Sequence, residues 1–138
     1  IFCDYDKYTD NKYRWKAIVG NTPIGIYIPK WRVPAPLPLW ISVKIFKPDD
    51  YHCPIVVHHD KNEVKKNQRL RSTPITAEVS YVEDKTRTAR YDPVLEGNDE
   101  REIGSPYIPF ALCNSRPKCL VIMINWEKRN RDYRNSRY

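Results

Sequence analysis

Apolar and polar residues alternate with a period of two along most of the chain, and the sequence has no long stripe with the 3.6-residue period of a helix. The alternating or β-branched runs are short, and residues that favour turns separate them. They cover residues 14–19, 24–28, 41–46, 55–59, 75–81, 86–91 and 119–126. Short runs at this spacing predict an all-β fold of about seven strands, arranged as a barrel or a sandwich.

Turn residues and prolines show how these strands connect. Residues 20–23 (Gly-Asn-Thr-Pro) and 83–85 (Glu-Asp-Lys) each separate two runs, which predicts two hairpins. The prolines between residues 30 and 39 exclude a regular helix or central strand there and favour an extended connector with at most a short helical turn. Residues 119–126 are apolar on both faces and are expected to form a central strand. The expected core contains Ile24, Ile26, Ile28, Ile41, Val43, Ile45, Val79, Ile122 and Ile124.

The composition is typical of one folded domain. The chain has 138 residues, of which 41% are hydrophobic and 12% aromatic, enough for a single core. No apolar run approaches the roughly twenty residues that a membrane-spanning helix needs, so we expect a soluble, cytoplasmic protein. We expect a domain over residues 1–127 and a basic tail or linker over residues 128–138. The first residue is not Met, which suggests a fragment of a longer protein.

The charge is positive and unevenly distributed. The chain carries 24 Lys and Arg against 17 Asp and Glu, a formal net charge of +7. Residues 14–47 contain basic side chains and no acidic one, whereas acidic residues gather in 49–63 and 92–102. Such segregation produces surface fields of one sign, which attract a polyanion. The alternative is a solvated surface that is basic without a partner.

The polar segment 61–71 is the strongest candidate for contact with DNA, and we expect it to be a loop. Its Lys and Arg side chains can neutralise phosphates or bond to guanine, its Asn and Gln side chains match adenine, and Glu63 can accept from cytosine. A second candidate is the turn after the strand that carries Arg14 and Lys16. An ordinary surface loop and an ordinary hairpin turn are the alternatives. The expected DNA-binding residues are Arg14, Lys16, Asn21, Thr22, Lys61, Asn62, Glu63, Lys65, Lys66, Asn67, Gln68, Arg69 and Arg71.

One alternative function is a metal-dependent nuclease. Asp49 follows a proline, and Glu63 and Lys65 follow in the PD…ExK order of magnesium-dependent nucleases, in which two carboxylates hold the metal. That chemistry needs Glu63 and Lys65 on a firm strand, and here they lie in a polar stretch. The neighbouring His58 and His59 would point to opposite faces of a strand, which disfavours a shared site. We therefore expect no catalytic residue, no metal and no cofactor.

Aromatic residues and cysteines suggest two further functions. Trp15, Trp31 and Trp40 lie in the stretch without acids and could stack on unpaired bases, as in a single-stranded nucleic-acid-binding β-barrel. Cys113 and Cys119 flank a turn, which is compatible with a disulfide in a secreted protein. The four cysteines lack the C-x-x-C pairs of zinc sites, and buried free thiols are the alternative.

A sequence of features resembles a known family. Residues 25–29 (Gly-Ile-Tyr-Ile-Pro) end a strand and precede the proline-bearing connector; a further strand, an acidic turn with Cys53 and Pro54, the run 55–59 and the basic, amide-rich segment follow in order. In this order, over about half of its length, the chain resembles the B3-like DNA-binding domains, and most closely those of restriction endonucleases.

The resemblance implies a seven-stranded open pseudobarrel with short helical turns, whose two arms hold the major groove of DNA. By position, the turn 20–22 with Arg14 and Lys16 would be the first arm, and residues 61–71 the second. The first arm is shorter here than the family pattern. The implied function is sequence-specific binding of double-stranded DNA by a non-catalytic recognition module, with a catalytic nuclease domain elsewhere in the parent chain.

Overall fold

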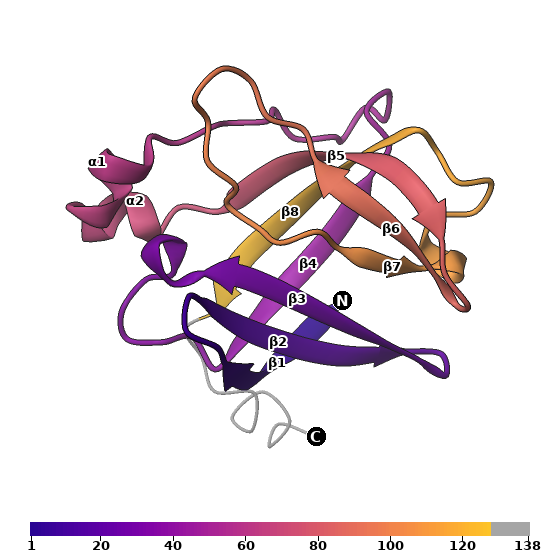
Figure 1. Cartoon of the computed structure of the whole chain (residues 1–138), viewed down its shortest axis with the longest axis horizontal. Helices are drawn as coiled ribbons and strands as arrows, with labels where there is room; N and C mark the ends of the chain where they lie inside the picture. Colours follow the sequence, from indigo (N-terminus) through magenta and orange to yellow (C-terminus); the bar gives the residue numbers. More distant parts are fainter. Residues whose placement is uncertain (128–138) are drawn as a thin grey trace.

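One antiparallel sheet of eight strands curls into a nearly closed barrel (Figure 1). The structure is a computed structural model that describes residues 1–127, so the expected tail over residues 128–138 lies outside the described residues. The all-β pseudobarrel with short helical turns is confirmed, with eight strands in place of seven. The strands are β1 (Phe2–Tyr8), β2 (Lys12–Val19), β3 (Thr22–Pro29), β4 (Trp40–Phe46), β5 (Ile75–Asp84), β6 (Thr88–Pro93), β7 (Tyr107–Pro109) and β8 (Cys119–Glu127).

The order of the strands explains the shape of the barrel. The sheet runs β3-β2-β1-β4-β8-β5-β6-β7, so β3 and β7 are its two edges. Beside β7, the backbone N–H of Gly104 donates to the carbonyl oxygen of Tyr27 in β3 at 2.8 Å. This contact draws the two edges together, and β4 and β8 form the wall farthest from the seam in the strand order.

The core follows the predicted alternation. Eight of the nine expected core residues are buried, and Ile45 is half-buried. The predicted central strand, β8, lies between β4 and β5 and pairs with both. Trp15 is fully buried, and its indole N–H donates to the carbonyl oxygen of Pro38 at 3.1 Å. The proline-bearing connector therefore closes over the core and contains one short helical turn, η1 (Lys30–Arg32), as expected.

The predicted strand at residues 55–59 is wrong. Only Val57 forms a bridge, to Thr76 in β5, and Ile55 is 84% exposed. β5 pairs along most of its length with β8 and β6, and β6 ends opposite Val79, so only the start of β5 is open to this segment. A β-branched run was therefore not enough to make a strand, because its neighbour offers little free edge.

Two strands were missed. β1 carries charged residues at Asp4, Asp6 and Lys7, which obscure its alternation, although Cys3 is fully buried. β7 has three residues, too few to show a period, and it leads into the helical turn η2 (Phe110–Leu112). Both strands depend on partners distant in the sequence, β4 for β1 and β6 for β7.

Candidate nucleic-acid interface

The segment expected to be a loop folds as two short helices, α1 (Lys61–Lys65) and α2 (Gln68–Arg71). Asp60 Oδ1 accepts from the backbone N–H groups of Asn62 at 2.8 Å and Glu63 at 3.3 Å. Asn67 Oδ1 caps α2 in the same way, at 3.0 and 3.3 Å from its two donors. Asp and Asn are favoured at this position because they satisfy N–H groups that a helix leaves without partners. The spacing of Asp60 and Glu63 was a helix-start signal available in the sequence.

Replacing Asp60 by Ala should lower the free energy of unfolding by about 1 kcal/mol, because α1 loses its cap. Urea denaturation of Asp60→Ala and Asp60→Asn would measure the change. Asn keeps the accepting oxygen and removes the charge, so Asp60→Asn should retain most of the stability. An equal loss in both variants would show that the charge, rather than the cap, is what stabilises the segment.

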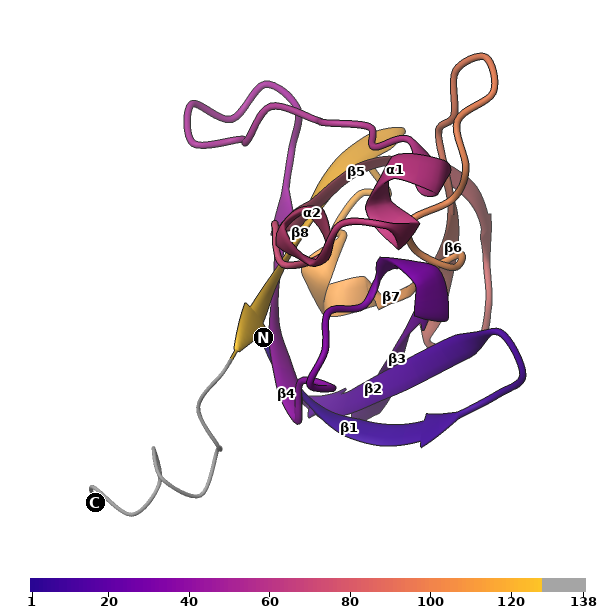
Figure 2. The same cartoon turned by 90° about the vertical axis from the view of Figure 1, so that its left-hand side faces the viewer.

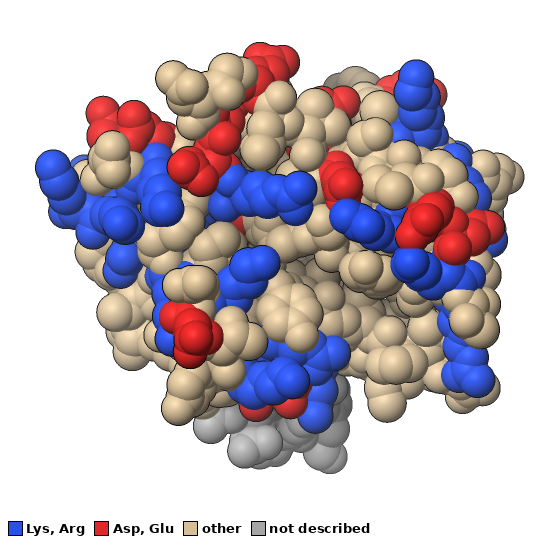
Figure 3. Space-filling model, viewed as in Figure 1, with Lys and Arg blue, Asp and Glu red and all other residues tan. Residues whose placement is uncertain are grey.

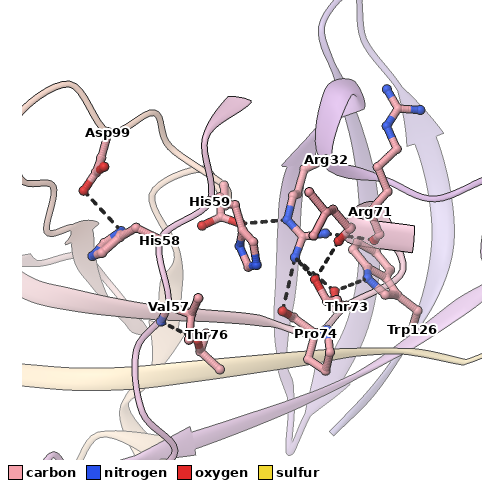
Figure 4. Close-up of polar contacts among 12 residues, drawn as sticks. Arg32, Val57, His58, His59, Arg71, Thr73, Pro74, Thr76, Asp99 and Trp126 are labelled. Atoms are coloured by element: carbon pink, nitrogen blue, oxygen red, sulfur yellow. Dashed lines mark hydrogen bonds and ion pairs between the residues drawn. The ribbon is translucent and has the colours of Figure 1, made fainter. Parts of the chain in front are cut away.

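A buried ion pair contacts both ends of this helical segment (Figure 4). Arg32 of η1 is 0% exposed, and its Nε donates to Glu102 Oε1 at 2.7 Å. Burial lowers the pKa of the Arg32 guanidinium, and the hydrogen bond to Glu102 opposes that change. The remaining guanidinium nitrogens donate to the carbonyl oxygens of Arg71 at 2.8 Å, Thr73 at 3.0 Å and Pro74 at 3.1 Å. The end of α2 is thus attached directly to the arginine.

The other end of the two-helix segment is attached to the same pair. His59 precedes the cap of α1, and its Nδ1 lies 3.0 Å from Glu102 Oε1. The neighbouring His58 faces Asp99 at 3.5 Å, so both histidines contact the chain between β6 and β7. Residue 59, just before α1, and residue 71, the last of α2, are therefore held by one buried pair, which limits movement of the segment relative to the barrel.

The basic side chains of this segment lack acidic partners. We define the α1–α2 face as Lys61, Lys65, Lys66, Arg69 and Arg71; within residues 1–127, none of them has a carboxylate at ion-pair distance. Lys61 Nζ lies 5.8 Å from the ring centre of Trp31. The helices stand in front of one end of the barrel in Figure 2, and basic side chains gather at that end in Figure 3, with acidic side chains beside them. Among the Lys and Arg residues of the described chain, the ion pairs with carboxylates involve Arg14, Lys16, Arg32, Lys85, Arg90 and Arg116.

The Asn and Gln side chains of the segment differ in whether they already form hydrogen bonds within the protein. Asn67 uses its side-chain oxygen to cap α2, and Gln68 Nε2 donates to the carbonyl oxygen of Ala35 at 2.6 Å. Asn62 is exposed, and within the described residues its side chain has no hydrogen bond. Asn62 is therefore the amide best able to contact a base edge without breaking an internal bond.

The structure does not bring the two expected arms together. The turn between β2 and β3 lies at the start of β3, whereas α1 and α2 lie near η1, at its end (Figure 1). The seven steps from Thr22 to Pro29 span about 23 Å at the usual rise of a strand. Asn21 is exposed at this turn, but Arg14 and Lys16 both pair with Asp6 of β1.

The hydrogen bond from Arg14, together with Lys16, lowers the pKa of Asp6 below its ordinary value of 3.8. A lowered folded-state pKa stabilises the protein above the ordinary value, and that contribution is lost as the pH falls through the folded-state pKa. Asp6→Asn should therefore be less stable than the unmodified chain at neutral pH, with a difference that shrinks on acidification. Urea denaturation from pH 7 to pH 2 measures it; a constant difference would contradict the pairing.

A cleft opens beside the first arm. It has a volume of about 480 Å³ and lies between the β2–β3 hairpin and the β5–β6 hairpin. The turn of the second hairpin brings Lys85, Thr86 and Arg87 to this cleft, a proximity that the sequence did not indicate. The lining residues are Arg14, Thr22, Pro23, Gly25, Tyr27, Lys85, Thr86, Arg87, Thr88 and Tyr107.

The residues of the nuclease pattern do not form a metal centre in the described structure. Glu63 is exposed on helix α1, and Asp49 lies in the turn after β4, so neither belongs to a strand. Among residues 1–127, no group of three or more His, Cys, Asp and Glu side chains could hold a metal ion. The candidate site therefore offers cations and amides, and no paired carboxylates.

The exposure of the tryptophans tests the alternative of a single-stranded nucleic-acid-binding protein, and the state of the cysteines tests the alternative of a secreted, disulfide-bonded protein. Trp15 is 0% and Trp40 is 4% exposed, so their rings are not available for stacking on bases, whereas Trp31 is half-buried. The four cysteines are free thiols, and the Cys113 sulfur lies 3.5 Å from the carbonyl oxygen of Pro109. Burial raises the pKa of the Cys113 thiol. None of the helices within residues 1–127 is long and apolar enough to cross a membrane.

No protein-family model, curated protein or solved structure matches the chain. The function must therefore be inferred from the residues of the site.

Proposed function

We propose that the chain binds double-stranded DNA through the α1–α2 face. The observation that carries this proposal is the combination of five basic side chains that have no acidic partner within residues 1–127 and a segment held at both ends by Arg32 and Glu102. Unpaired surface cations attract phosphates, and a fixed segment loses little conformational freedom when it binds. A solvated basic surface would not require this anchoring.

The resemblance to B3-like domains supports a sequence-specific reader of the kind found in restriction endonucleases. In that case, contacts between the Lys and Arg side chains and the phosphates set the register, and a few side chains contact the edges of the nucleobases. Asn62 and Arg69 are exposed on the two helices and are the side chains we assign to base contact. The chain would supply recognition, and a catalytic nuclease domain of the parent protein would cut.

The burial of Trp15 and Trp40 favours duplex over single-stranded ligands. Single-strand binders use several exposed aromatic rings as stacking platforms. Here only Trp31 remains among the three candidates, and Lys61 lies over its ring. We therefore assign the single-stranded binder, which would depend on Trp31, as the second candidate.

A binding assay with labelled random-sequence duplex, single-stranded DNA and RNA, repeated over a range of salt concentrations, tests the proposal. We expect tighter binding to duplex DNA and an affinity that falls steeply as salt increases, because bound counterions are released. Selection and sequencing of the retained duplexes should yield a preferred site. Equal or tighter binding to single strands would favour the second candidate, and absence of binding at low salt would reject both.

A further inference from the structure

The cleft between the two hairpins contains cations and hydroxyl groups. Arg14, Lys85 and Arg87 contribute the positive charges, and its lining, all within the described residues, includes no carboxylate. Hydroxyl groups come from Thr22, Tyr27, Thr86, Thr88 and Tyr107. Arginine, lysine and hydroxyl donors are the groups that proteins use to hold backbone phosphates of nucleic acids.

Arg14 is fixed across the wall of this cleft by its neighbours. Its guanidinium pairs with Asp6 and lies 5.6 Å from the ring centre of Tyr27. A Cβ atom at Gly25 would stand 2.6 Å from Arg14 Nη2, so a side chain at residue 25 would displace the guanidinium from its present place over strand β3. Arg14 Nε is buried and, within the described residues, has no hydrogen-bond partner. The glycine thus makes room for a cation at the wall.

The nearby ion pairs leave the cleft positive. Asp6 is shared between Arg14 and Lys16, so these three side chains together retain one positive charge. Lys85 is neutralised by Glu83, whereas Arg87 is exposed and, among residues 1–127, has no acidic partner. A ligand with one or two negative charges matches this balance.

We propose that the cleft is a second phosphate-binding site, which takes a backbone phosphate of the same duplex that the α1–α2 face holds; this inference rests on the proposed function. The cleft is lined by β3 from Thr22 to Tyr27, so its outer end lies about 23 Å along the strand from Pro29, which precedes the η1 turn that α1 contacts. A duplex rises about 3.4 Å per base pair, so a phosphate at this outer end of the cleft, where Arg87 lies in the second hairpin turn, is about seven base pairs from the α1–α2 end of β3. The footprint therefore extends along the seam between β3 and β7.

Arg87→Gln tests the cleft, because Arg87 is exposed in a turn and pairs with no carboxylate of the described chain. The probes are an 18-base-pair random-sequence duplex and a DNA hairpin with a stem of six base pairs. Binding of each labelled probe is measured by fluorescence anisotropy over a range of salt concentrations. On the long duplex, Arg87→Gln should raise Kd about 5- to 10-fold at 0.1 M salt and reduce the slope of log K against log salt by about 0.9. On the short stem, the variant and the unmodified chain should bind alike.

Lys44→Gln is the matched control, because Lys44 is exposed on β4, in the wall opposite the seam. It should leave the long-duplex Kd within about twofold of that of the unmodified chain. If the unmodified chain binds the long duplex and Arg87→Gln binds it equally well, the cleft proposal is wrong and the proposed function stands. A loss of equal size on the short stem also overturns the second site. Failure of the unmodified chain to bind either probe rejects both proposals.

Discussion

Glu102→Gln is expected to lower the free energy of unfolding by about 3–5 kcal/mol, because it leaves the buried charge of Arg32 without its counterion. The guanidinium is 0% exposed and Glu102 is 6% exposed, so water cannot replace the lost carboxylate. The hydrogen bonds to the carbonyl oxygens of Arg71, Thr73 and Pro74 hold the guanidinium in place and prevent it from turning outward. Urea denaturation at neutral pH measures the change.

Asp99→Asn is the matched control for this prediction. Asp99 lies in the same segment as Glu102, but it faces His58 at 3.5 Å and its side chain is 30% exposed. A pair of this kind contributes at most about 1 kcal/mol. A loss below about 1 kcal/mol in Glu102→Gln, as in the control, would mean that the carbonyl oxygens alone stabilise the arginine.

The same variant should also weaken binding to DNA if the proposed function is correct. Glu102 contacts His59 directly, and Arg32 holds the carbonyl of Arg71, so the two ends of the helical segment lose a shared support. The Lys and Arg side chains of the α1–α2 face are unchanged, so the salt dependence of DNA binding should stay close to that of the unmodified chain. A lower affinity with an unchanged slope would separate positioning of the segment from loss of charge.

The strand pattern was predictable because alternation is a local property of the sequence. β2, β3, β4, β5, β6 and β8 were identified from their own residues, and their inward positions form the core. β7 and the failed strand at 55–59 depend on which edge of the sheet is free, and that is decided by residues elsewhere in the chain. β1 was missed because its own charged residues obscure the alternation of apolar and polar positions.

The residue types of the candidate site were predictable from the sequence, but the tertiary contacts that hold them in place were not. The bases and amides of residues 61–71 are visible in the sequence, but the pair that supports them joins Arg32 to Glu102, 70 residues apart. A period or a motif cannot indicate such a contact. The same limit applies to the cleft, where Arg87 of one hairpin meets Arg14 of another.

Simultaneous replacement of Lys65, Lys66 and Arg69 by Ala is expected to raise the Kd for duplex DNA about 10²- to 10³-fold at 0.1 M salt, because three cations that release counterions are lost. The slope of log K against log salt should fall by about 2.7. All three side chains are exposed, so the free energy of unfolding should change little. Anisotropy of a labelled duplex over a range of salt concentrations gives both quantities.

The matched control is the simultaneous replacement of Lys7, Lys44 and Lys47 by Ala. These residues are also exposed, and both triple variants lower the formal net charge from +7 to +4. If binding depended only on total charge, the two variants would lose affinity equally, and the assignment of the α1–α2 face would be rejected. A large loss confined to the first variant would identify the face. Single replacements then separate phosphate from base contacts, because loss of a base contact weakens selection at one position of the site by about 1–3 kcal/mol.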